Sequence, residues 1–283
     1  MLLDLLHKTV RRRFHSLGFE SHILESRFGR LHYLLRDHAE PAGTLLLVHG
    51  LGTSSSTWVK VLPLLQGRYR IAALDLPGFG FSTLNGDRTF CTLQEHVEAL
   101  AIFADAVGCT PVILLGHSFG GWISAFYASR HPHNVKHLVL VDTAGVYYRG
   151  VEKLRESFTL SSVQDTRRLL NGLWFRYPWY FKPFAGAIFR ELRQRGMNDL
   201  VGSIGAEYFL VEELSKLSMP VSIIWGRQDT VILPESVDVL VKFVPHARAS
   251  FLDQCGHVPQ LEQPAEFAAV VREILEKNNN ELA

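Results

Sequence analysis

Apolar residues along this chain occur in short uninterrupted runs, separated by longer stretches in which they recur at helical spacing. The runs cover residues 44–48, 70–74, 112–115, 138–141, 221–225 and 248–252. Runs of this length without polar interruption are typical of strands that are buried on both faces of a parallel sheet. The helical spacing predicts helices near residues 57–65, 93–107 and 121–129. This alternation predicts successive βα units.

Two further strands are predicted before the first buried run, at residues 21–26 and 30–36. Phe28-Gly29 lies between them, so the two strands should form an opening hairpin. The expected fold class is therefore α/β, with a mostly parallel central sheet of about eight strands flanked by helices.

A different pattern separates the fourth buried run from the fifth. From about residue 150 to 217 there is no convincing strand run, and the helical patches are broken by Pro178 and Pro183. We interpret residues 150–217 as a helical cap inserted into a core domain, which comprises residues 21–149 and 218–283.

The most aromatic part of the chain lies in this cap, at residues 174–181. Packing of the cap onto the core accounts for most of these rings. Because substrate pockets are mostly apolar, we expect Trp174, Phe175 and Trp179 to contact the substrate, together with Val258 from the core.

The first 20 residues predict an amphipathic helix. Lys8 and Arg11-Arg12-Arg13 occupy much of its polar side, and the apolar side is formed by Leu2, Leu3, Leu6, Val10, Phe14 and Leu17. We expect this helix to dock on the body of the protein or on another subunit. The alternative is that residues 1–19 bind peripherally to an anionic membrane surface.

Composition narrows the classes of partner and compartment. The chain has 283 residues, and its 29 Lys and Arg nearly cancel its 28 Asp and Glu, so nucleic acid is not an expected partner. Its three cysteines show neither CxxC nor zinc-ligand spacing, which fits a reducing compartment. Without an 18-residue apolar stretch or a signal-peptide pattern, a cytoplasmic location is expected.

The strongest chemical signal is Gly116-His117-Ser118-Phe119-Gly120, a G-x-S-x-G motif that follows a buried strand and precedes a helical pattern. A serine on so sharp a turn presents its hydroxyl outward at a helix N-terminus. There the N–H of Phe119 can stabilise an oxyanion. We therefore predict that Ser118 is a nucleophile.

A serine hydroxyl needs a base and a group that orients this base. His257 follows the last buried strand and is the predicted base. The main alternatives are His49 and His117, which we expect to hold loops in place. Asp229, after the preceding strand, is the predicted acid, which gives the chain order Ser, Asp, His. Asp142 is the main alternative acid; Asp253 is nearer in sequence but ends its own strand.

A second oxyanion donor is expected in His49-Gly50-Leu51-Gly52, where the glycines allow close approach of the backbone to a substrate. We predict the N–H of Leu51. The motif lacks the lysine and hydroxyl of a phosphate-binding loop. Asp75, in a second glycine-rich strand exit, is expected to bond nearby backbone N–H groups.

Taken together, these motifs resemble the α/β-hydrolase superfamily over residues 43–274. They are His49-Gly50-Leu51-Gly52, Asp75-Leu76-Pro77-Gly78-Phe79-Gly80, Gly116-His117-Ser118-Phe119-Gly120-Gly121, Gly226-Arg227-Gln228-Asp229 and Gly256-His257. Within the superfamily the chain looks most like capped carboxylesterases and monoacylglycerol lipases. The resemblance implies ester hydrolysis through an acyl-enzyme, with Ser118 attacking and His257 shuttling the proton.

The expected function is thus that of a serine esterase acting on a small ester or lipid-like molecule, with no metal or organic cofactor. The main alternative is a carbon–carbon bond hydrolase of ring-fission diketones, which uses the same triad and a similar cap. Peptidase and thioesterase activity, and a non-catalytic binding protein on this fold, are further alternatives. The sequence leaves the oligomeric state open.

Overall fold

The computed structural model describes residues 9–10, 12–65, 67–108, 110–146, 151–205 and 209–280. One eight-stranded sheet has the order β1-β2-β4-β3-β5-β6-β7-β8. The strands are β1 (Glu20–Ser26), β2 (Gly29–Arg36), β3 (Gly43–Val48), β4 (Tyr69–Leu74), β5 (Val112–His117), β6 (Val135–Val141), β7 (Val221–Gly226) and β8 (Arg248–Leu252). Only the pairings of β2 are antiparallel. The predicted fold class is confirmed.

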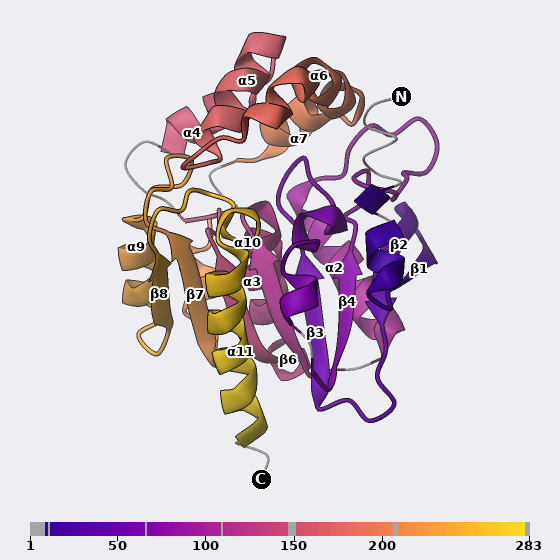
Figure 1. The fold of residues 1–283 in the computed structure, drawn as a ribbon, viewed down its shortest axis with the longest axis vertical. Coiled ribbons are helices and arrows are strands. Elements are labelled where there is room, and N and C mark those ends of the chain that lie inside the picture. Colours follow the sequence, from indigo (N-terminus) through magenta and orange to yellow (C-terminus); the bar gives the residue numbers. More distant parts are fainter. Residues whose placement is uncertain are drawn as a thin grey trace.

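Helices cover both faces of the sheet (Figure 1). One apolar cluster joins the sheet to α2 (Leu93–Val107), α3 (Phe119–Arg130) and α9 (Ser236–Phe243), and a second joins the opposite face to α11 (Pro264–Asn280). Along β3, Leu46 and Val48 belong to the first cluster and Leu45 and Leu47 to the second. Because successive side chains of a strand point to opposite faces, burial on both faces requires the uninterrupted apolar run.

The segment between β6 and β7 forms a layer of short helices above one edge of the sheet (Figure 1). It contains α4 (Val151–Phe158), α5 (Val163–Gly172), the 3₁₀ helix η4 (Trp179–Phe184), α6 (Ala185–Gln194) and α7 (Met197–Ser203). These cap helices have an apolar cluster of their own, with Leu160, Leu169, Leu192, Met197 and Val201. The following α8 (Val211–Leu214) packs instead on the main core, through Leu210 and Leu214.

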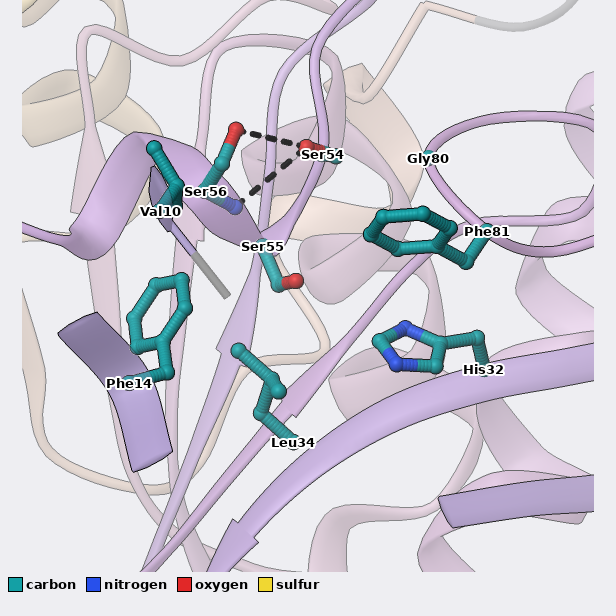
Figure 2. Close-up of a pocket in the computed structure, with 9 residues that line it drawn as sticks. All are labelled: Val10, Phe14, His32, Leu34, Ser54, Ser55, Ser56, Gly80 and Phe81. Carbon is teal, nitrogen blue, oxygen red and sulfur yellow. Dashed lines mark hydrogen bonds between the residues drawn. The ribbon is translucent and has the colours of Figure 1, made fainter. Parts of the chain in front are cut away.

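The N-terminal helix is described from residue 9 onward, so that residues 1–8 of the predicted amphipathic helix lie outside the described part. Residues 9–10 and 12–16 are helical. Phe14 is buried in the second apolar cluster, and Val10 and Leu17 pack against it. Figure 2 shows Val10 and Phe14 beside Ser55 and Ser56, which begin the 3₁₀ helix η1 (Ser55–Trp58). The described apolar positions of this helix therefore face the body of the protein.

No helix in the described ranges is long and apolar enough to cross a membrane.

Candidate active site

Ser118 occupies the turn between β5 and α3. Its backbone has φ of 54° and ψ of −118°, and its N–H donates to the carbonyl of Val141 at 2.8 Å. A non-glycine residue in this region costs about 1 to 3 kcal/mol and persists only where its surroundings impose it. Gly116 and Gly120 allow the tight packing around this turn, because a Cβ on either one would collide with backbone. The turn thus places the Ser118 hydroxyl at the carboxyl edge of the sheet.

His257 and Asp229 complete a hydrogen-bonded series with this serine. The Ser118 hydroxyl lies 2.9 Å from Nε2 of His257, and the other ring nitrogen, Nδ1, lies 2.7 Å from Oδ2 of Asp229. Oδ1 of Asp229 accepts the N–H groups of Val231 at 2.8 Å and Ile232 at 3.1 Å. The structure therefore brings the three predicted residues together, with the carboxylate held in place by backbone donors.

Asp142, the alternative acid, lies at the end of β6 and is fully buried. Its Oδ1 accepts the N–H of Gly226 at 2.9 Å. Burial and the neighbouring Asp229 carboxylate raise the pKa of Asp142 well above its ordinary value, because a second negative charge there would be neither solvated nor neutralised. His257 directs Nδ1 to Asp229. The geometry thus favours Asp229 as the orienting acid and leaves Asp142 as a buried neighbour with a raised pKa.

Among the described residues, Asp142, Asp229 and His257 are also the only group of three whose side-chain atoms lie close enough to share a metal ion, within 4.8 Å of one another. All three are buried. Both ring nitrogens of His257 already take part in the series with Ser118 and Asp229. A cation here would have to displace those bonds, so the cluster is better explained by the Ser–His–Asp series than by metal binding.

Two further histidines support the loops of the site. His117 donates from Nε2 to the carbonyl of His257 at 2.7 Å, and burial lowers the pKa of His117 to about 3, so its ring is neutral. His49 accepts the N–H of Leu76 on Nε2 at 2.9 Å and donates from Nδ1 to the carbonyl of Gly50 at 2.8 Å. These contacts match the loop-holding role expected for them.

Glu262 is a supporting residue that sequence reasoning missed. It ends α10 (Pro259–Glu262), and its two carboxylate oxygens accept the N–H of Gly256 at 2.8 Å and the N–H of Phe175 at 2.8 Å. The Glu262 side chain thus connects the loop that carries His257 to the cap. The available signal was an acidic residue five positions after His257, but its partners are backbone groups that the sequence does not reveal.

The predicted oxyanion donors flank Ser118. Phe119 is the first residue of α3, and Leu51 follows Gly50 in the loop after β3. A Cβ on Gly50 would lie 2.8 Å from Nδ1 of His117 and 3.2 Å from Cβ of Ser118. Only glycine lets this loop approach the serine so closely, and the close approach brings the backbone next to Leu51 toward the position of a reacting carbonyl.

A cavity of about 270 Å³ lies between this edge of the sheet and the cap. Ser118, His257 and Leu51 line the cavity on the side of the sheet, and mostly apolar residues line it on the side of the cap. Of the four residues predicted to contact substrate, Trp174 and Val258 line the cavity. Phe175 and Trp179 lie outside this lining, with 40% and 77% of their surface exposed.

A second series of Ser, His and Asp includes His32, which lines a pocket together with Val10 and Phe14 of the N-terminal helix (Figure 2). The Ser21 hydroxyl is 2.6 Å from Nε2 of His32, and Nδ1 of His32 is 2.8 Å from Oδ2 of Asp75. Asp75 also accepts the N–H groups of Ser55 at 2.6 Å and Phe81 at 2.9 Å, as expected from sequence. Ser21 lies in a regular strand pairing with Leu34 rather than on a sharp turn. This series positions loops.

Comparison with known proteins places the chain in a family. A sequence model of the alpha/beta hydrolase fold matches residues 43–219. Lipase 3 of Moraxella sp. (strain TA144) is 30% identical over 239 residues, which cover 77% of this chain and 72% of the lipase. The 2-hydroxymuconate semialdehyde hydrolase of Pseudomonas sp. (strain CF600) is 31% identical over 260 residues, which cover 84% of this chain and 89% of that hydrolase.

A solved structure of a bacterial membrane phospholipase A superposes with a TM-score of 0.85 at 29% identity, covering 98% of this chain and 92% of the phospholipase. Fold, motif order and sequence similarity agree, and they confirm the resemblance inferred from the motifs. The chain belongs to the α/β-hydrolase fold family.

Proposed function

We propose that this protein hydrolyses carboxylic esters, with Ser118 as nucleophile, His257 as general base and acid, and Asp229 as the acid that orients the histidine. The observation that carries the proposal is the continuous series of hydrogen bonds from Ser118 through His257 to Asp229, on the sheet side of an apolar cavity. A relative named as a lipase and a solved phospholipase A support the ester as the bond that is cleaved.

The series performs the reaction in two halves. Oγ of Ser118 attacks the ester carbonyl as its proton passes to Nε2 of His257, and the resulting oxyanion is held by the N–H groups of Leu51 and Phe119. The imidazolium then gives this proton to the leaving alcohol, which leaves an acyl-enzyme. Water attacks the acyl group with His257 again as base, and Ser118 is restored. Asp229 fixes the tautomer of His257 and stabilises the imidazolium in both halves.

The cavity favours an uncharged substrate with an apolar acyl group. Among its described lining residues the only Lys or Arg is Arg195, whose guanidinium donates to the carbonyls of Gly78 at 2.6 Å and Gly80 at 2.9 Å and also contacts Glu191. An anionic substrate would find no uncommitted cation there. The apolar lining on the side of the cap instead suits hydrocarbon, which makes a lipid-like or small apolar ester the proposed substrate.

Carbon–carbon hydrolysis is the second candidate, because a relative of 31% identity is named as a 2-hydroxymuconate semialdehyde hydrolase. A muconate derivative carries a carboxylate. In this cavity Arg195 would have to leave the carbonyls of Gly78 and Gly80 before it could pair with such a group. This rearrangement disfavours the second candidate.

Labelling with a fluorophosphonate probe tests the proposed nucleophile, and turnover of p-nitrophenyl esters of increasing chain length tests the reaction. We expect labelling and turnover in the wild type and neither in Ser118→Ala. Ser21→Ala is the matched control, because Ser21 belongs to the other Ser–His–Asp series, and it should behave as wild type. Labelling without turnover of any ester would instead support carbon–carbon hydrolysis.

A further inference from the structure

The cap exposes an aromatic surface that catalysis does not use. Eight large apolar side chains of the described residues are exposed, and three of them, all aromatic, lie within six consecutive positions. They are Phe175, Trp179 and Tyr180, with 40%, 77% and 49% of their surface exposed; we call them the aromatic turn. Large apolar side chains grouped on a surface mark sites of interaction with another molecule or with a membrane.

This surface is continuous with the cavity. Tyr180 lies between an exposed neighbour and an enclosed one: its ring centroid is 6.1 Å from that of Trp179 and 4.9 Å from that of Phe181. Phe181 and Trp174 line the cavity, and their centroids are 5.9 Å apart. Rings in contact therefore extend from the outside of the cap to the space above Ser118, so that a molecule bound at the aromatic turn would lie beside the cavity.

The charged residues of the cap segment around the aromatic turn indicate which class of molecule would bind there. Residues 174–184 include Arg176 and Lys182 and contain no Asp or Glu. The guanidinium of Arg176 lies over the ring of Phe175, 5.4 Å from its centroid. Glu262, the acidic group packed beneath the segment, has its carboxylate engaged by the N–H groups of Phe175 and Gly256. The exposed face thus combines Trp and Tyr with two cations, the combination that favours the interface of an anionic bilayer.

We propose that the aromatic turn docks this enzyme on an anionic lipid surface and thereby brings the cavity next to lipid. The apolar side chains Val10, Phe14 and Leu17 of the N-terminal helix pack against the core, so these described positions are not open to a bilayer, whereas the aromatic turn is exposed. The proposal rests on the proposed function only in that a lipid-like ester would then reach Ser118 from the bilayer. Docking itself requires no catalysis.

Co-sedimentation of the full chain with vesicles tests this proposal. Vesicles of phosphatidylcholine with about 30% phosphatidylglycerol should bind the wild type, and binding should weaken in high salt and on pure phosphatidylcholine. The double variant Trp179→Ser/Tyr180→Ser should bind at least tenfold more weakly. Ile23→Ser/Val241→Ser is the matched control, because it removes two exposed apolar side chains from β1 and α9. It should bind as wild type.

Three outcomes would overturn the proposal: wild type that does not bind these vesicles, a cap variant that binds as well as wild type, or wild type that self-associates in sedimentation while the cap variant is monomeric. The last would assign the aromatic turn to contact between two copies. Turnover of p-nitrophenyl butyrate in solution, measured in parallel, should be unchanged in both double variants. Its absence from the wild type would contradict the proposed function without affecting the vesicle result.

Discussion

At the carboxyl edge of the sheet, Ser118, His257 and Asp229 are at most 5% exposed, whereas the cap above them leaves Trp179 77% exposed. Residues of the edge are fixed by backbone groups of the main core, as Asp229 is by two N–H donors. The cap has a small apolar cluster of its own and reaches the core through individual polar contacts, such as that of Arg195 with Gly78. The sheet edge therefore determines the reaction, and the cap determines which molecule reaches it.

The largest effect should come from the nucleophile. In Ser118→Ala we expect kcat for a p-nitrophenyl ester to fall by about 10⁵ to 10⁶-fold, because only binding and the oxyanion donors remain. Near-normal turnover with an unchanged melting temperature would remove Ser118 from this role.

The next largest effect on kcat distinguishes the roles of the two aspartates near His257. Asp229→Asn should lower kcat about 10⁴-fold, because the amide cannot hold the catalytic tautomer. Asp142→Asn should change kcat by less than about tenfold, because Nδ1 of His257 bonds to Asp229 and the pKa of Asp142 is raised, which favours its uncharged form. Steady-state kinetics of both variants decide the assignment, and a larger loss in Asp142→Asn would reverse it.

A smaller effect is expected where the cap meets the core. Arg195→Met removes the donors to the carbonyls of Gly78 and Gly80, charge-assisted bonds of about 1.5 to 3 kcal/mol each. We expect KM for long-chain esters to rise about tenfold or less, with kcat for p-nitrophenyl acetate within threefold of wild type. Arg193→Met is the control, because Arg193 bonds to Leu160 within the cap. Equal effects in both variants would mean that the contact with the core does not matter.

The smallest expected effect is a change in how the melting temperature depends on pH when Asp142 is replaced. Because the pKa of Asp142 is raised in the fold above its unfolded value, the folded state binds the extra proton, and its stabilisation is lost as pH rises from about the ordinary value of 3.8 through the raised one. Asp142→Asn removes this titration. The melting temperature of the variant relative to wild type should therefore increase by a few degrees, about 2 to 4 °C per kcal/mol, as pH rises. A constant difference across pH would contradict the assignment.

The sequence predicted the sheet and the edge residues because their signals are local. Burial on both faces requires the apolar run of β3, and the turn at Ser118 requires its neighbouring glycines. His257 and Asp229 could be found because each follows a strand, and the carboxyl ends of parallel strands meet at one edge.

Contacts of the cap could not be predicted in the same way. Arg195 binds carbonyls more than 100 positions earlier in the chain, and any residue can supply a carbonyl. Composition likewise cannot tell which rings of residues 174–181 face the cavity. Trp174 lies inside and Trp179 outside, because the chain turns at Pro178 into the 3₁₀ helix η4.

The backbone N–H of His257 donates to the carbonyl of Leu173 at 2.9 Å. Leu173 lies at the C-terminal end of α5, in the cap. If the cap moved away from the core at Leu173, this hydrogen bond would break or His257 would be displaced with the cap. The cap therefore cannot open at Leu173 without disturbing the catalytic base. An opening for substrate access has to be placed elsewhere in the cap. Hydrogen exchange should find the His257 amide slow to exchange during turnover, and rapid exchange would show that the cap opens at Leu173.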